Sequence, residues 1–235
     1  MLMPIMPQAG FAAGAIALVY SSDTADVDGF AAAGSPAGDV VVNITITSGT
    51  ELYASTTSNY GLDLNGFSAG SLVNLFIEGE IQGKGGKTSG AAGGPALRLG
   101  CETNTSGAGA IRGGGGAGGQ GGSSKGSATD AELGCIAVGG NVSGGAGGDG
   151  QDRVGGPASG STGGSVYAAK NAGTGGTGGA WGAAGNTGGT GNANTCGAPG
   201  YNNAGSAGGA AGLAIKTQSN TYSNLVTTTN GSISA

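Results

Sequence analysis

The sequence predicts a fold built from short β-strands and irregular extended segments, with almost no α-helix. Three observations predict it: 58 glycines among 235 residues, apolar residues that alternate with polar ones before Gly79, and glycine at every third position in much of the remainder. A period of two is typical of a strand with one buried face. A period of three fits neither strand nor α-helix but matches the extended left-handed helix of three residues per turn.

Composition divides the chain into four parts. We expect an apolar arm over residues 1–35, a small β unit over 36–82, a glycine-rich bundle over 83–213 and a closing strand over 214–235. All eight lysines and arginines lie at or after Lys84, with five of the thirteen acidic residues, so the glycine-rich part is mildly basic. These charges form no basic patch, and nucleic-acid binding through phosphate contacts is not expected.

The first part contains an apolar run from Phe11 to Tyr20. It resembles a signal sequence, but no positive charge precedes it, and Pro4 and Pro7 lie before the run. A cleaved signal is therefore the less favoured alternative. The run is too short to cross a bilayer, and we expect no membrane insertion. We predict that the arm attaches to a partner protein through five side chains: Phe11, Ile16, Leu18, Val19 and Tyr20.

Two stretches of the second part predict strands. In DVVVNITIT, which begins at Asp39, the apolar residues Val42, Ile44 and Ile46 alternate with polar ones. In SLVNLFIEGEIQG, one side of the predicted strand is apolar and the other carries polar residues. The sequence therefore predicts a β unit that ends where the glycine-rich part begins.

The third part keeps glycine in one register from Gly173 to Gly191, and the same spacing recurs over 113–122 and 144–150. Collagen is disfavoured because the chain has only 6 prolines and its runs are interrupted. A polyglycine II bundle uses the same helix: glycine lets the backbones approach, and interhelix N–H···O and Cα–H···O bonds replace an apolar core. We predict residues 173–191 to be one rod of such a bundle.

A single rod would not be stable. Ordering a residue costs about 1–2 kcal/mol of backbone entropy, whereas a hydrogen bond returns about 1 kcal/mol net. Glycine runs recur along the chain with short apolar pieces between them, such as PALRLG and GLAIKTQ. This pattern predicts several rods, bonded in more than one direction and linked by brief strands.

The sequence lacks the side chains that most enzymes use. It has no histidine, which removes Ser-His-Asp and Cys-His catalysis. Cys101, Cys135 and Cys196 lack zinc-site spacing, and three free thiols are favoured over one disulfide. IQGKGGKT approaches a Walker A loop, but Ile81 replaces its first glycine and no helix is predicted to follow. We therefore expect no catalytic, cofactor or metal site, and no enzyme.

Two places are candidates for recognition. Trp181 is the single tryptophan, and it either packs on the bundle or is exposed for contact with a receptor. Tyr201, Asn202 and Asn203 follow a Pro199-Gly200 turn signal, so we expect them in a loop. Loop aromatics beside amides are typical of recognition surfaces, although a solvated turn has the same composition.

Two stretches resemble a known family. VNLFIEGEIQGKGGKTSGAAGGPALRL, a strand followed by a glycine burst and an apolar piece, is similar to glycine-rich tail proteins of bacteriophages, and NTYSNLVTTTNGSISA looks like their final strand. The resemblance implies a tail-fibre tip adhesin, made in the host cytoplasm, that binds an outer-membrane protein or a surface glycan through loops at one end. It also implies attachment to other tail proteins through the N-terminal part, and leaves a homotrimer open.

Three alternatives stand beside this expectation. A purely structural tail component would share the glycine-rich sequence pattern without binding a receptor. A secreted, glycine-rich bacterial surface protein would need a convincing signal sequence. An ice-binding protein would need a regular uncharged face, whereas charged residues such as Lys125, Asp149 and Lys170 interrupt the runs.

Overall fold

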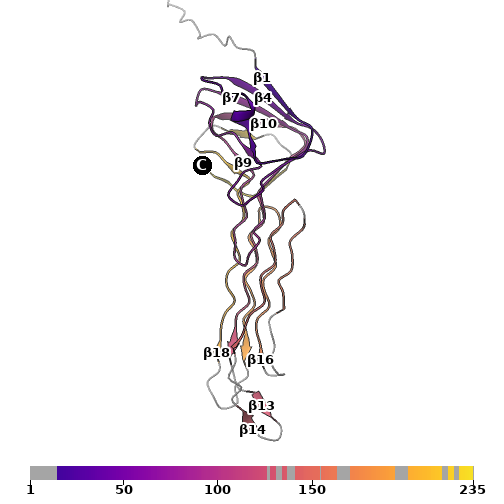
Figure 1. The fold of residues 1–235 in the computed structure, drawn as a ribbon, viewed down its shortest axis with the longest axis vertical. Helices are drawn as coiled ribbons and strands as arrows, with labels where there is room; N and C mark the ends of the chain where they lie inside the picture. The colour runs from indigo at the N-terminus through magenta and orange to yellow at the C-terminus, as the bar shows by residue number, and fades with distance from the viewer. Residues whose placement is uncertain are drawn as a thin grey trace, which may run out of the picture.

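The computed structural model describes residues 15–125, 128–130, 134–136, 141–153, 155–162, 170–193, 201–218, 222–224 and 228–234. The molecule is elongated, with a β domain at one end and extended segments that run from it to the far end (Figure 1). Strands and extended segments dominate, and a single helix, α1 (Gly29–Ala32), occurs among the described residues. The expected fold class is confirmed.

The β domain contains three parallel sheets of five strands each. Sheet A consists of β1 (Ile16–Tyr20), β4 (Val41–Ile46), β7 (Leu72–Ile77), β10 (Glu102–Ser106) and β20 (Tyr222–Asn224). Sheet B consists of β2 (Thr24–Ala25), β5 (Glu51–Tyr53), β8 (Glu80–Gln82), β11 (Ala110–Arg112) and β21 (Thr228–Asn230). Sheet C consists of β3 (Val27–Asp28), β6 (Leu62–Asp63), β9 (Leu97–Arg98), β19 (Ile215–Lys216) and β22 (Ile233–Ser234). Because the chain visits sheets A, B and C in turn, it winds as a three-sided parallel β-helix.

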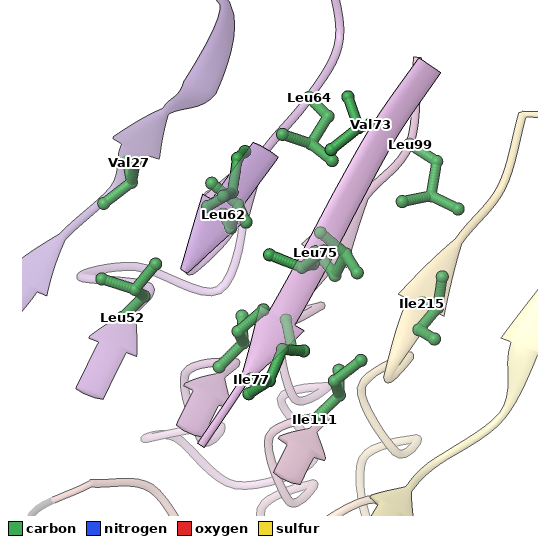
Figure 2. Packing of buried hydrophobic residues seen from close by; sticks show 14 of the residues in the cluster. Val27, Leu52, Leu62, Leu64, Val73, Leu75, Ile77, Leu99, Ile111 and Ile215 are labelled. Carbon is green, nitrogen blue, oxygen red and sulfur yellow. The ribbon is translucent and has the colours of Figure 1, made fainter. Parts of the chain in front are cut away.

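The inside of the β-helix is filled by aliphatic side chains stacked from coil to coil (Figure 2). The alternation predicted in DVVVNITIT is confirmed, since Val42, Ile44 and Ile46 are fully buried in β4 and the residues between them face outward. Ile44 lies beside Leu75 of the next coil in the same register. Each coil extends this apolar column, which is the main source of stability for the domain.

The glycine-rich segments are insertions at one corner of the β-helix. The first leaves after β8 and returns at β9, and the second leaves after β11 and returns at β19. Both corners lie between sheet B and sheet C. β19 pairs with β9, which lies more than a hundred residues earlier in the sequence. After the long insertion the chain therefore returns to sheet C of the β-helix.

This arrangement differs from the predicted four parts. Residues 16–28 form the first coil and not a separate arm. Residues 97–112 belong to the β-helix, although they fall inside the predicted bundle of 83–213. The closing part supplies β19 and a whole coil, β20 to β22, where one strand was expected. Strands of two residues carry too little pattern to be recognised in the sequence.

The inserted bundle is organised around residues 113–122. From Gly114 to Gly122, backbone N–H groups donate to the carbonyl oxygens of three other segments, and the carbonyl oxygens of 113–122 accept from three more, with N···O distances of 2.7–3.0 Å. Each direction is repeated every third residue. Its described neighbours are 83–90, 91–94, 145–151, 173–182, 183–189 and 206–212. Hydrogen bonds toward six neighbours with a period of three are those expected of polyglycine II-like helices.

Glycine is required because the segments touch through their backbones. A Cβ atom built on Gly118 would lie 1.9 Å from the carbonyl oxygen of Gly176. A Cβ on Gly119 would lie 1.9 Å from the carbonyl oxygen of Ser206. Real Cβ contacts are much longer, so any other residue would have to push a backbone segment out of the bundle.

The prediction of one rod over 173–191 is wrong. Two antiparallel segments meet there, because Asn186 N–H donates to the Thr177 carbonyl and Gly189 N–H donates to the Thr174 carbonyl, both at 2.8 Å. The chain reverses at Trp181 and Gly182, and Gly182 has a φ of 62° that favours glycine. The turn keeps the period of three in the sequence, which is why it could not be seen there.

Short antiparallel strands end the bundle at its far end (Figure 1). β12 (Ser124–Lys125) pairs with both β15 (Asn141–Val142) and β18 (Tyr201–Asn202). β13 (Ala128–Asp130) pairs with β14 (Gly134–Ile136), and β16 (Lys170–Asn171) pairs with β17 (Asn192–Ala193). We call this region the distal end and the junction with the β-helix the base. Within the described ranges, no helix is long and apolar enough to span a membrane.

Candidate adhesive end and base of the bundle

The distal end contains a shallow polar hollow of about 290 Å³. Its side chains are amides and hydroxyls, from Gln120, Ser123, Ser143, Asn203 and Ser206, and its remaining lining is glycine and alanine. Asn203 Nδ2 donates to Ser123 Oγ at 2.8 Å, and the Gln120 N–H donates to Ser206 Oγ at 2.8 Å. These bonds hold neutral hydrogen-bonding groups at a fixed place on the bundle end. We call this set the distal hollow.

The structure brings one predicted recognition segment to this end. Asn203 is exposed and lines the distal hollow. Tyr201 and Asn202 precede it in β18, where they pair with Lys125 and Ser124, so they lie in a strand and not in the expected loop. The pairing was not predictable, because both strands contain only two residues and come from distant parts of the sequence.

Trp181 is at the other end of the bundle. The centre of its ring lies 6.0 Å from the Arg112 guanidinium carbon, and the backbone N–H of Trp181 donates to Gln151 Oε1 at 3.1 Å. Arg112 ends β11, so this contact is at the base. The extended segment 113–122 runs from the base into the distal hollow, a length of about 30 Å at ~3.1 Å per residue. Trp181 and Asn203 therefore cannot contribute to one site.

A buried carboxylate fixes the base of the bundle. The side chain of Asp152 is 2% exposed, and its Oδ2 lies 2.9 Å from Lys84 Nζ and 3.0 Å from Lys87 Nζ. Lys87 Nζ also lies 3.4 Å from Asp149 Oδ2. Burial lowers the pKa of Lys87, but the hydrogen bonds and charges of Asp152 and Asp149 outweigh it and raise that pKa overall. The two lysines of IQGKGGKT are thus engaged by carboxylates and are not arranged around a phosphate.

Arg153 joins the same region to the β-helix. Its guanidinium forms ion pairs with Asp23 and Glu51 and lies 4.5 Å from the centre of the Tyr53 ring. The hydrogen bond that Arg153 Nε donates to Glu51 is the largest cause of the raised pKa of Arg153. Sequence reasoning missed these partners, because each pair joins residues about a hundred positions apart.

The predicted attachment residues divide into two groups. Ile16, Leu18 and Tyr20 point inward from β1 and pack, half-buried, against the core. Val19 points outward and is 66% exposed. Phe11 lies outside the described residues. Because inward and outward positions alternate along β1, three of the five side chains pack inside the β-helix and are not available to a partner protein.

The cysteines show no reactive arrangement within the described residues. Cys101 is buried in the core, and burial raises the pKa of its thiol to about 11. Cys135 lies in β14, whereas Cys196 lies outside the described residues, so the predicted free thiols stay a prediction for these two. No group of side chains suited to a metal ion occurs among the described residues.

The fold and the polar distal end define an elongated display scaffold, with a compact domain at one end and a hydrogen-bonding surface at the other. The family model for GP38, described as phage tail fibre adhesin Gp38, matches residues 15–234. The chain therefore belongs to this family, and it is a tail-fibre adhesin of a bacteriophage. The predicted resemblance is confirmed, and the secreted-protein and ice-binding alternatives are set aside.

Among solved structures, the chain is similar to the gp37-gp38 adhesin tip complex of the bacteriophage S16 long tail fibre. The two share 21% sequence identity with a TM-score of 0.54, and the match covers 92% of this chain and 81% of the other. At this identity the likeness establishes a shared fold. The comparison with curated protein sequences gave no match.

Proposed function

We propose that the distal end of the bundle contacts a receptor on the host surface, while the β-helix joins the protein to other tail proteins. One observation carries this proposal: the hydrogen-bonded bundle separates two surfaces by about 30 Å. A rigid spacer of this kind holds a recognition surface away from the fibre without the entropy loss of a flexible linker. The protein acts by binding, and its place is in the tail of the particle.

The chemistry of the distal hollow suits a polar, uncharged partner surface. Amide and hydroxyl groups both donate and accept hydrogen bonds, so the hydroxyls of a glycan and the exposed backbone of an outer-membrane protein loop are equally suitable. Tyr201 and Asn202 belong to β18, which lies at the same end. Aromatic residues beside amides provide a large contact area at low entropy cost.

The partner on the tail side is another tail protein, made with this chain in the host cytoplasm. Support comes from the similar structure, which is a gp37-gp38 complex at the adhesin tip of a long tail fibre. The β-helix core and the bundle hydrogen bonds both close within one chain. This closure favours one copy over the homotrimer that the sequence left open.

Purified protein tests the adhesive role directly. It should decorate host cells and slow adsorption of the parent phage, and the double variant Gln120→Ala/Asn203→Ala should weaken both effects at least tenfold. Trp181→Phe, a change at the base, should leave both unchanged. If saturating wild-type protein neither decorates cells nor slows adsorption, adhesion at the distal end is refuted, and a purely structural place in the tail becomes the better account.

A further inference from the structure

We propose that the outer face of sheet A is the surface on which the end of the tail fibre docks, an inference that rests on the proposed tail-side attachment. The topology gives the first argument. Both glycine-rich insertions leave the β-helix at the corner between sheets B and C. In a three-sided helix, the face opposite that corner is sheet A. Figure 1 shows β1, β4, β7 and β10 at the end of the molecule opposite β13, β14, β16 and β18.

The composition of this face gives the second argument. Its outward positions alternate with the buried ones along each strand, and we call them together the A face. They are Ala17, Val19, Val41, Asn43, Thr45, Leu72, Asn74, Phe76, Glu102, Asn104, Ser106 and Ser223. Glu102 is the single charged residue among them. A flat surface that nearly lacks charge is typical of the fully covered core of an interface.

The other two sides of the β-helix are charged. Sheet B carries Glu51, Glu80 and Arg112 in its strands, and its outer side is covered in part by the ion pairs of Arg153. Along sheet C, Asp28, Asp63, Arg98 and Lys216 occupy one row of neighbouring positions. The charged residues thus lie on sheets B and C and not on the A face. Packing of the β-helix core does not require this distribution, because all these side chains point outward.

Exposed apolar side chains concentrate on the A face. Val19 is 66% exposed and Phe76 is 45% exposed. Both lie in one cross-strand row, with Thr45 between them. Adjacent strands are about 4.8 Å apart, so the two side chains are separated by about 10 Å and one partner segment can cover both. Of the large apolar residues that are exposed in the described chain, only Ile233 lies elsewhere.

Three asparagines of the A face are hydrogen-bonded to one another. Asn74 Nδ2 donates to Asn43 Oδ1 at 3.0 Å, and Asn104 Nδ2 donates to Asn74 Oδ1 at 3.4 Å. This asparagine ladder fixes the amides flat against the sheet. A partner can cover a paired amide at much lower cost than an unpaired one, since fewer hydrogen bonds to water are lost.

The size of the face indicates what the partner must cover. Five strands at ~4.8 Å and five or six residues at ~3.3 Å give about 400 Å², roughly half of the ~800 Å² that each partner buries in a stable interface. Because the face has little charge and exposes Val19 and Phe76 at the end opposite the distal hollow, we assign the occupant as the end of the tail-fibre protein, which would present an apolar surface of little charge.

Incorporation into particles tests the assignment. The parent phage would carry Val19→Lys/Phe76→Lys, with Ile233→Lys, whose exposure matches that of Phe76, as a control outside the A face. Purified particles would be assayed for copies of this protein by quantitative mass spectrometry. The double variant should fall at least tenfold below wild type, and the control should match wild type. Because all three positions are exposed, the purified variants should keep their melting temperatures; Val19→Thr/Phe76→Gln replaces the double variant if it fails to fold.

The outcomes separate this inference from the adhesive role. Free double-variant protein should still decorate host cells as wild type does, because the distal hollow is untouched. If particles incorporate the double variant at the wild-type level, the A face is not the docking surface, whatever the cell-binding result. If wild-type free protein fails to decorate cells but the double variant is absent from particles, the docking assignment stands and the adhesive proposal alone is lost.

Discussion

At the scale of single residues, glycine serves two different purposes in this chain. Gly118 and its counterparts are needed because a neighbouring carbonyl oxygen occupies the place of a Cβ atom. Gly182 is needed for a positive φ at the hairpin turn. The period of three predicted the first purpose from the sequence. It concealed the second, because the turning residue falls in the same register as the packed ones.

Replacing Gly118 with valine should unfold the bundle or destabilise the protein by at least ~3 kcal/mol, because the new Cβ would meet backbone and not a side chain that can rotate. Gly156→Val is a matched control, since no atom lies within 4 Å of its Cβ position. Its effect should stay within about 0.5 kcal/mol, the usual range for surface changes. Thermal unfolding measures both, and equal melting temperatures would contradict the packing described.

Cys101 should resist alkylation in the folded protein at pH 8. Burial raises its pKa to about 11, whereas an unfolded cysteine titrates near ~8.5, so the reactive thiolate is scarce in the native state. The contribution of Cys101 to stability is full below about pH 8.5 and is lost as pH rises toward 11. Iodoacetamide labelling followed by peptide mass spectrometry checks this. Labelling as fast in buffer as in urea would show that the site is open.

At the scale of elements, the base of the bundle depends on side-chain pairs that the sequence does not show. The β4 and β7 strands were predictable because their alternation runs over six residues. The strands of sheet C were not, because two residues define no period. The partners Lys84 and Asp152 could not be predicted either, since a glycine-rich sequence gives no rule for how its segments return to one another.

Replacing Asp152 with asparagine should destabilise the junction by about 1–3 kcal/mol. This is less than the 3–5 kcal/mol of a fully buried pair, because the two lysines keep part of their hydration. Asp149→Asn, a change at an exposed carboxylate, should cost less than about 0.5 kcal/mol. Urea unfolding of the two variants decides this, and a larger loss for Asp149→Asn would overturn the assignment of Asp152 as the anchor.

The same pairs predict how stability changes in alkali. The pKa of Lys87 is raised in the folded state, so its contribution is complete below the unfolded value of ~10.4 and disappears as pH rises through the higher folded value. The melting temperature of wild type should fall above about pH 10.4. Asp152→Asn should show a shallower fall there, because its lysines have already lost that partner. Parallel curves would indicate that Lys87 is not coupled to Asp152.

At the scale of the whole molecule, the insertion at one corner of the β-helix gives the protein two separate surfaces, one on the β-helix and one at the distal end. The strands that pair across more than a hundred residues, such as β9 and β19, place the base of the bundle opposite sheet A. The sequence predicted the two kinds of structure and the family. It could not predict that Trp181 lies at the base and Asn203 at the distal end, because that depends on where each extended segment reverses.

Site-specific photocrosslinking tests most directly whether the two ends have different partners. A benzophenone amino acid would be placed at position 19 on the A face or at position 203 in the distal hollow, and the particles would be illuminated while adsorbing to host cells. Position 203 should crosslink to a component of the host surface and position 19 to a tail-fibre protein. Crosslinks from position 203 to the fibre, or from position 19 to the host, would contradict the account.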